Sequence, residues 1–438
     1  MLVARTLISE PGSSNRGTLK TSAFTMARSS IPYLVRPPTA VLTRGFDPRL
    51  SVGSARPAVF RSSTYVFSSP EAAERAFAIA LGRSKPAAGE SVDLIYSRLS
   101  HPNAEILEDQ LVPLEKGAEA AAVFNSGMAA ISTVFLALCP VGSAFIYTTP
   151  IYGGTQHLIH QFLEPLGIRA IPVPAGDGPA MARAIAETQD LKLVFIETPA
   201  NPTLIMTDIQ AAVKAVGAST GVKPLVAVDN TFLGPVFQHP LDLGADLSVY
   251  SATKYLAGQS DILAGVVMSP DSTLIASLRG MRAILGNILQ PDECWILDSR
   301  LPTVELRMSR QSKNAARIVP QLAEHPKVRA AYYPALITDP EQARIRDKQC
   351  RFPGAVFALD LHGGRSAAFD FLRRLRIAKN AVSLGGVETL ACHPRTTTHS
   401  EMSTDELTRY GIGEGLVRVS IGVEDHRDLL RDFLDALA

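Results

Sequence analysis

The sequence has little cysteine, almost no net charge and no long apolar run. Its four cysteines among 438 residues include no CxxC pair, which argues against a disulfide framework or structural zinc and fits a reducing compartment. The 43 basic and 42 acidic residues leave a net charge of +1, so no nucleic-acid footprint is evident. No apolar stretch reaches transmembrane length. We therefore expect a soluble, cytoplasmic protein.

A metal site is not indicated either. His393 and His399 lie six positions apart, which places them on no common helical face. No carboxylate or thiol pattern completes a set of ligands around them. We expect no metal.

The order of apolar runs predicts an α/β fold. Runs at 120–124, 143–148, 168–173, 191–197 and 225–230 alternate with helix-length segments such as 177–189. This alternation is typical of a mostly parallel sheet with helices on both faces, which binds ligands beyond the carboxyl ends of its strands. After about residue 304 the pattern changes. We expect a smaller α+β C-terminal domain there, with strands at 355–361, 387–393 and 416–422 and a helix at 424–437.

One lysine follows a predicted buried strand in the stretch 247–267. The strand leads into Ser251, Thr253 and Lys254, and no acid lies three or four positions from the lysine to pair with it. Such a lysine suits Schiff-base formation with an aldehyde cofactor, because burial lowers the pKa of its amine. The two hydroxyls before it suit a phosphate group.

An acid 25 residues earlier completes this chemistry. Asp229 lies in the apolar run 225–230, and a carboxylate at the end of a buried strand is costly unless it is paired. A protonated pyridine nitrogen is the partner that pyridoxal 5′-phosphate (PLP) requires, because its ring accepts electrons only while that nitrogen is protonated. The structural alternatives are an N-capping aspartate and a solvated Lys254. The combination favours PLP as cofactor.

A phosphate site is also indicated after the run 120–124. Ser126, Gly127 and Met128 follow a predicted strand and open a helix, where free N–H groups and the helix dipole attract phosphate. Glycine permits close approach of the phosphate. A Ser-Gly turn is common elsewhere, so the indication gains weight only from Ser251 and Thr253 serving the same phosphate.

Seven motifs make the sequence resemble the Cys/Met-metabolism, or trans-sulfuration, family of fold-type I PLP-dependent transferases. They are YSR (96–98), NSGMAAI (125–131), ETPANPT (197–203), VDNT (228–231), SATKYLAG (251–258), SLGGVETL (383–390) and LVRVSIGVED (416–425). They follow the family's order from about residue 45 to the C-terminus, which is far more specific than one motif. The resemblance implies a PLP-binding large domain at 106–303 and a C-terminal domain at 304–438.

The resemblance implies roles for further residues. Tyr152 stacks on the cofactor ring and serves in acid–base steps, and Asn201 contacts the ring hydroxyl. Arg418 lies in an apolar strand and binds the substrate α-carboxylate, assisted by the turn at Ser383. The alternatives are a loop tyrosine without a role, an ordinary Asn-Pro turn and an arginine whose head reaches solvent.

The resemblance also implies an arm at 45–105 that crosses to a neighbouring subunit. Tyr96 and Arg98 then bind that subunit's cofactor phosphate, for which the planar guanidinium is suited because it donates two hydrogen bonds at once. A surface aromatic and a solvated arginine are the alternatives. We expect a homodimer at least, and a homotetramer by resemblance. The insertion at 82–93 predicts a loop that the motifs do not explain.

Residues 1–44 differ from the rest of the chain. They hold six basic residues against Glu10 alone, with many serines and threonines. A transit peptide has this composition. We favour a disordered tail or an upstream start codon, with Met26 as the true start.

The expected reaction is γ-elimination from methionine or homocysteine, which yields 2-oxobutanoate, ammonia and a thiol. Val382 stands where cystathionine γ-lyases place a glutamate for the distal amine. Against this, Gly154 replaces a cysteine of bacterial methionine γ-lyases, and Arg282-Ala283 replaces their Lys-Asp pair. A γ-replacement enzyme (cystathionine γ-synthase or O-acylhomoserine sulfhydrylase), a cystathionine lyase and a PLP-binding protein without turnover are the alternatives.

Overall fold

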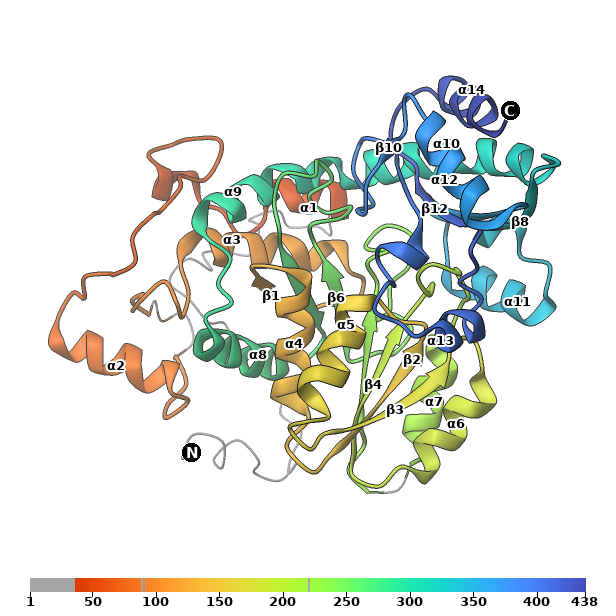
Figure 1. Ribbon diagram of the computed structural model, residues 1–438. Coiled ribbons are helices and arrows are strands. Elements are labelled where there is room, and N and C mark those ends of the chain that lie inside the picture. The colour runs from red at the N-terminus through yellow and green to blue at the C-terminus, as the bar shows by residue number, and fades with distance from the viewer. Residues whose placement is uncertain (1–35, 88–89, 91, 220) are drawn as a thin grey trace.

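The computed structural model describes residues 36–87, 90, 92–219 and 221–438 (Figure 1). Residues 1–35 of the predicted tail lie outside the described residues, as do 88, 89 and 91 of the insertion. The described part of the insertion contains no helix or strand, in agreement with the predicted loop.

A seven-stranded sheet forms the centre of the larger part of the molecule. Its strand order is β1-β7-β6-β5-β4-β2-β3, and β2 to β6 pair in parallel. The strands are β1 (Ala120–Phe124), β2 (Ala144–Thr149), β3 (Arg169–Pro174), β4 (Leu191–Glu197), β5 (Leu225–Asp229), β6 (Leu247–Ser251) and β7 (Gly265–Ser269). The predicted mostly parallel sheet is confirmed. The antiparallel strand β7, between β1 and β6, was not predicted.

Helices cover both faces of this sheet (Figure 1). Along β4, Leu193 and Phe195 join the apolar cluster that includes α4 (Gly127–Leu138) and α8 (Ser272–Leu285). Val194 and Ile196 join the cluster that includes α6 (Gly178–Glu187) and α7 (Ile209–Ala218). Strands buried on both faces carry nearly continuous apolar runs, which is why the sequence pattern located them. The helices are α3 (Pro102–Leu111), α4 (Gly127–Leu138), α5 (Gly153–Leu158), α6 (Gly178–Glu187), α7 (Ile209–Ala218), α8 (Ser272–Leu285) and α9 (Pro291–Arg300).

A smaller five-stranded sheet with order β10-β11-β12-β9-β8 follows the long helix α10 (Val304–Ala323). Its strands are β8 (Val328–Tyr332), β9 (Val356–Leu361), β10 (Lys379–Asn380), β11 (Leu390–Cys392) and β12 (Leu416–Ser420). The remaining helices are α11 (Pro340–Gln349), α12 (Gly364–Arg374), α13 (Thr404–Arg409) and α14 (His426–Leu437). This confirms the α+β character predicted for the C-terminal part. No described helix has the length and apolarity to cross a membrane.

The first described helix is one that composition alone did not reveal. Helix α1 (Pro37–Thr43) contacts α3, and its Ala40 and Val41 are buried. Helix α1 thus contributes apolar side chains to the folded chain, and the boundary at residue 44 stays a prediction. The following arm extends from the body of the molecule and carries helix α2 (Pro70–Ala80) (Figure 1).

Candidate active site

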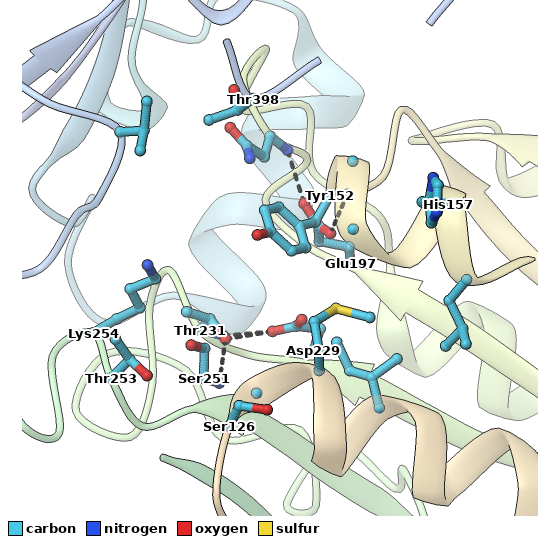
Figure 2. Close-up of a pocket in the computed structure, with 18 of the residues that line it drawn as sticks. Ser126, Tyr152, His157, Glu197, Asp229, Thr231, Ser251, Thr253, Lys254 and Thr398 are labelled. Atoms are coloured by element: carbon cyan, nitrogen blue, oxygen red, sulfur yellow. Dashed lines mark hydrogen bonds between the residues drawn. The ribbon is translucent and has the colours of Figure 1, made fainter. Parts of the chain in front are cut away.

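A cavity of about 910 Å³ lies beyond the carboxyl ends of β4, β5 and β6, where sheets of this kind bind ligands. β12 and the loop before β11 line it from the smaller sheet. The predicted site residues in its lining are Ser126, Gly127, Met128, Tyr152, Asn201, Asp229, Ser251, Thr253, Lys254, Val382 and Arg418. Figure 2 shows Lys254, Asp229 and Tyr152 around this space.

The amine of Lys254 lies in the cavity without an acidic partner among the described residues. Its Nζ is 3.1 Å from Ser383 Oγ, which places the predicted Ser383 beside the lysine. Burial, and to a lesser degree the positive charge of Arg418, lowers the pKa of Lys254 from 10.5 to about 8. Near neutral pH a fraction of this amine is therefore uncharged and nucleophilic.

This lowered pKa predicts how fast protein freed of cofactor recombines with PLP. Only the uncharged amine attacks the aldehyde, so the recombination rate should rise with pH and level off above about 8. Replacing Arg418 by methionine removes a like charge and should shift this midpoint upward. The measurement is the rate at which visible absorbance develops after mixing. If the recombination rate of the wild type has its midpoint at about pH 10, close to the pKa of a solvated lysine, the prediction is contradicted.

Asp229 is the buried acid at the end of β5. Its Oδ1 accepts hydrogen bonds from Thr231 N at 3.0 Å and Thr231 Oγ1 at 2.6 Å (Figure 2). Burial raises the pKa of Asp229, and the two bonds from Thr231 oppose that rise. Only one of the carboxylate oxygens is occupied by these bonds. A cationic ring nitrogen in the cavity would restore the charged form of the carboxylate.

The first turn of α4 and the end of β6 form a cradle at one end of the cavity. Ser126 caps α4 by accepting the Ala129 N–H at 3.1 Å, while the N–H groups of Gly127 and Met128 have no partner within the helix. A Cβ at Gly127 would lie 2.8 Å from Ser251 Cβ, so only glycine fits this contact. The cradle, Asp229 and Lys254 together fit the phosphate, ring and aldehyde ends of PLP.

Thr253, at the turn that carries Lys254, hydrogen-bonds to the backbone of Ala264. Its hydroxyl accepts the Ala264 N–H at 3.0 Å and lies 3.3 Å from Ala264 O. This hydroxyl therefore holds the chain between β6 and β7 against the turn that carries Lys254. Donation to a phosphate would require its proton to turn away from the carbonyl.

Arg418 crosses from β12 into the cavity and is 3% exposed. Its guanidinium donates to Asn201 Oδ1, Val382 O and Ser383 O, each at 3.2 Å. All three acceptors are neutral, so no carboxylate neutralises the arginine through these bonds. A buried arginine bound only by neutral groups favours an anionic ligand.

Tyr96 and Arg98 do not line the cavity of their own chain. Arg98 Nη1 donates to Ala283 O at 2.8 Å, and its guanidinium lies 5.8 Å from the centre of the Tyr96 ring. Tyr96 is 42% exposed. The two residues thus form a partly exposed pair on the arm, and their expected role at a neighbour's cofactor stays a prediction.

Two other sequence features have structural explanations. Arg282 lies outside the cavity, where it is buried and pairs with Glu108 at 2.7 Å, while Gly154 lines the cavity.

His399 bonds to Asn201 O at 3.1 Å and His393 to Glu414 O at 2.9 Å. Within the described ranges no three histidine, cysteine or acidic side chains cluster as metal ligands would.

Sequence reasoning assigned no role to three further residues of the cavity. Glu197 ends β4 and is buried, and His157 Nδ1 pairs with Glu401 Oε2 at 2.9 Å. The signal for Glu197 was present, because it is an acid that ends an apolar run just as Asp229 does. The pairing of His157 with Glu401 joins segments 244 positions apart and has no local signal.

Comparison with known proteins places these residues in a family. Residues 38–438 match the model for Cys/Met metabolism PLP-dependent enzymes. An L-methionine gamma-lyase of Pseudomonas deceptionensis is 37% identical over 400 residues, covering 91% of this chain and 96% of that protein. The cystathionine beta-lyase MetC of Bacillus subtilis is 37% identical over 342 residues, covering 78% and 85%. The crystal structure of a cystathionine gamma synthase from Xanthomonas oryzae pv. oryzae, in complex with cystathionine, matches with a TM-score of 0.83 and 32% identity, covering 92% and 98%.

Proposed function

This chain belongs to the Cys/Met metabolism family of PLP-dependent enzymes, and we propose that it catalyses γ-elimination from methionine or homocysteine. The observation that carries the proposal is a lysine with a lowered pKa in one cavity with a buried aspartate. The products would be 2-oxobutanoate, ammonia and a thiol. Methionine γ-lyases among the relatives and the apolar Val382 in the cavity support this choice of substrate.

The lining of the cavity supports a position for each part of the cofactor. PLP, when bound, supplies an aldehyde for amines and a protonated ring that accepts electrons. The cradle of Ser126, Gly127, Met128 and Ser251 would hold the phosphate, and Asp229 would hold the ring nitrogen. Tyr152 and Asn201 line the space between these two ends.

The chain's own residues then bind the substrate and move its protons. Arg418 would bind the α-carboxylate, which orients Cα toward Lys254 because both line the same cavity. The amine of Lys254, whose pKa burial lowers to about 8, would accept a proton from Cα and return it elsewhere on the substrate near neutral pH. Ser383 Oγ, 3.1 Å away, steadies the amine during these transfers. Tyr152 is the second candidate for proton transfer.

A second function is favoured by the pair of His157 and Glu401. The pair lines the cavity and offers one group of each charge when His157 is protonated. A distal amino-acid group, with an ammonium and a carboxylate, matches both charges. This favours cystathionine as substrate, or cysteine as the attacking thiol in γ-replacement.

A panel of amino acids, assayed for 2-oxo acid release with and without added thiols, separates the two functions. Release of 2-oxobutanoate from methionine or homocysteine without thiol is the result expected of the γ-lyase. Turnover of an acylhomoserine that produces a thioether only with thiol would show γ-replacement instead. Absence of both would contradict the proposal.

Val382 should discriminate against cystathionine. Val382 lines the cavity but is 57% exposed in the single chain. Where the bound substrate displaces water from this position, an ammonium left without a partner costs about 1–3 kcal/mol, and 1.36 kcal/mol is about tenfold in rate. We therefore expect kcat/KM for cystathionine to be at least about tenfold below that for methionine. Val382→Glu should narrow or reverse this ratio, and Val382→Gln is the uncharged control. If Val382→Glu leaves the ratio of the two kcat/KM values unchanged, another group must discriminate between the substrate side chains, with His157 and Glu401 as candidates.

Two inactive variants should complement each other if the arm completes a neighbour's site. Arg98→Ala removes the donated arginine, and Lys254→Ala removes the lysine of the recipient. In a mixed dimer one site combines both intact halves, so mixing and reassembly should restore up to about a quarter of wild-type activity by random pairing. Activity assays and light scattering measure this. A fully active monomer would contradict the shared site.

A further inference from the structure

Glu197 joins two loops of the cavity through one carboxylate. Its Oε2 accepts the Tyr152 N–H at 2.8 Å (Figure 2), and its Oε1 accepts the Asn201 N–H at 3.1 Å. Tyr152 follows β2 and Asn201 follows β4, so the carboxylate connects the ends of two neighbouring strands. Its position is itself fixed, since the Glu197 N–H donates to Thr148 Oγ1 at 2.9 Å.

The connection continues from Asn201 across the cavity to the lysine. Asn201 Oδ1 accepts from Arg418, whose guanidinium also donates to Ser383 O, and Ser383 Oγ contacts Lys254 Nζ. This chain of contacts therefore runs from the Tyr152 backbone to the lysine amine and includes residues from both sheets. Among the hydrogen bonds of the described residues, only the bond to Glu197 connects Tyr152 to this chain of contacts.

The position of Glu197 beside Asp229 supports a role in the site. The two acids are partners in the parallel register of β4 and β5, and both are buried. Burial first, and the charge of Asp229 second, raise the pKa of Glu197, while the hydrogen bonds from the Tyr152 and Asn201 N–H groups and the charge of Arg418 oppose the rise. A structural anchor alone does not require a second carboxyl beside Asp229, where each disfavours the charge of the other.

We propose that Glu197 is a positioning residue for PLP, which fixes the Tyr152 ring and the Asn201 side chain in the wall of the cofactor cavity. The inference rests on the proposed PLP site and holds whichever carbon–sulfur bond is cleaved. Without the carboxylate, two backbone N–H groups lose their acceptor, and the two loops are no longer tied to the end of β4.

The test compares Glu197→Gln and Glu197→Ala with a matched control, Asp432→Asn. Asp432 is also buried and accepts three backbone N–H groups, from Arg376, Ile377 and Ala378, but it does not line the cavity. The readouts are the dissociation constant of PLP and the visible circular dichroism of the bound cofactor, measured on the full-length protein. Thermal unfolding of each variant reports the loss of stability separately.

We expect Glu197→Ala to raise the dissociation constant of PLP about tenfold or more and to change the circular dichroism. Glu197→Gln, which keeps one acceptor oxygen, should change both in the same direction and less. Asp432→Asn should lower stability and leave both unchanged. In a Tyr152→Ala background Glu197→Gln should have a smaller effect, because there is no ring left to position.

Two results would overturn the proposal. One is a Glu197→Gln variant that binds PLP with the affinity and the circular dichroism of the wild type. This result would refute the positioning role even if the alanine variant does not fold. The other is an Asp432→Asn variant that raises the dissociation constant of PLP as much as Glu197→Gln does. A wild-type protein that binds no PLP would instead refute the proposed function.

Discussion

Substituting alanine for Lys254 should give a folded protein that develops no visible absorbance with PLP and turns over no sulfur amino acid. The amine is the nucleophile for the aldehyde and the proton carrier in the proposed reaction. Loss of general acid–base catalysis alone lowers rates by about 10²–10⁴, so activity should fall at least that far. The variant should be no less stable than the cofactor-free wild type at pH 7, because it no longer buries an amine whose charged form is disfavoured.

Two control variants make this prediction specific. Lys254→Arg keeps a positive charge but supplies no amine that forms a Schiff base, so it should behave like the alanine variant. Lys116→Ala removes a lysine that is paired with Asp242 at the surface and should leave spectrum and turnover unchanged. Absorbance, kcat/KM and thermal unfolding are the measurements. A Lys254→Ala variant that keeps substantial turnover would refute the proposed mechanism.

The sequence predicted those features of the fold that depend on local pattern. The strands around the cavity were located within a residue or two because both of their faces are buried, as along β4. β7 (Gly265–Ser269) was missed because its short apolar run lies in the same stretch as the lysine turn and resembles a continuation of that segment. Helix α1 was missed because the basic, serine-rich composition of the residues before it outweighed the buried Ala40 and Val41.

The candidate site was predictable where each residue has its own local signal. Lys254 and Asp229 stand out because a charged group at the end of a buried strand needs an explanation. Glu197 has the same signal, yet its function depends on which backbone groups it meets, and that follows only from tertiary structure. The contact between Ser383 and Lys254 spans 129 positions and likewise has no local signature.

Replacing Asp229 by asparagine should be nearly as damaging as losing the lysine. The amide has similar volume and its oxygen can still accept both Thr231 donors, so the variant should fold. It carries no negative charge and cannot favour a proton on the ring nitrogen of PLP. Removing one partner of a buried charge pair costs about 3–5 kcal/mol, which at 1.36 kcal/mol per factor of ten lowers kcat/KM about 10²–10⁴-fold.

The charge of Asp229, rather than its hydrogen bonds, should account for this loss. Thr231→Val removes the hydroxyl bond to Asp229 and the acceptor of the Ser251 N–H at 2.9 Å, but it keeps the carboxylate. It should therefore lower kcat/KM much less than Asp229→Asn does. A PLP analogue methylated on the ring nitrogen carries a permanent positive charge and needs no acid to maintain it. It should restore part of the activity of Asp229→Asn and none of Lys254→Ala, as measured by 2-oxo acid release. Equal losses in Thr231→Val and Asp229→Asn, with no recovery by the analogue, would show that Asp229 acts through local structure, because the electrostatic role requires the two variants to differ.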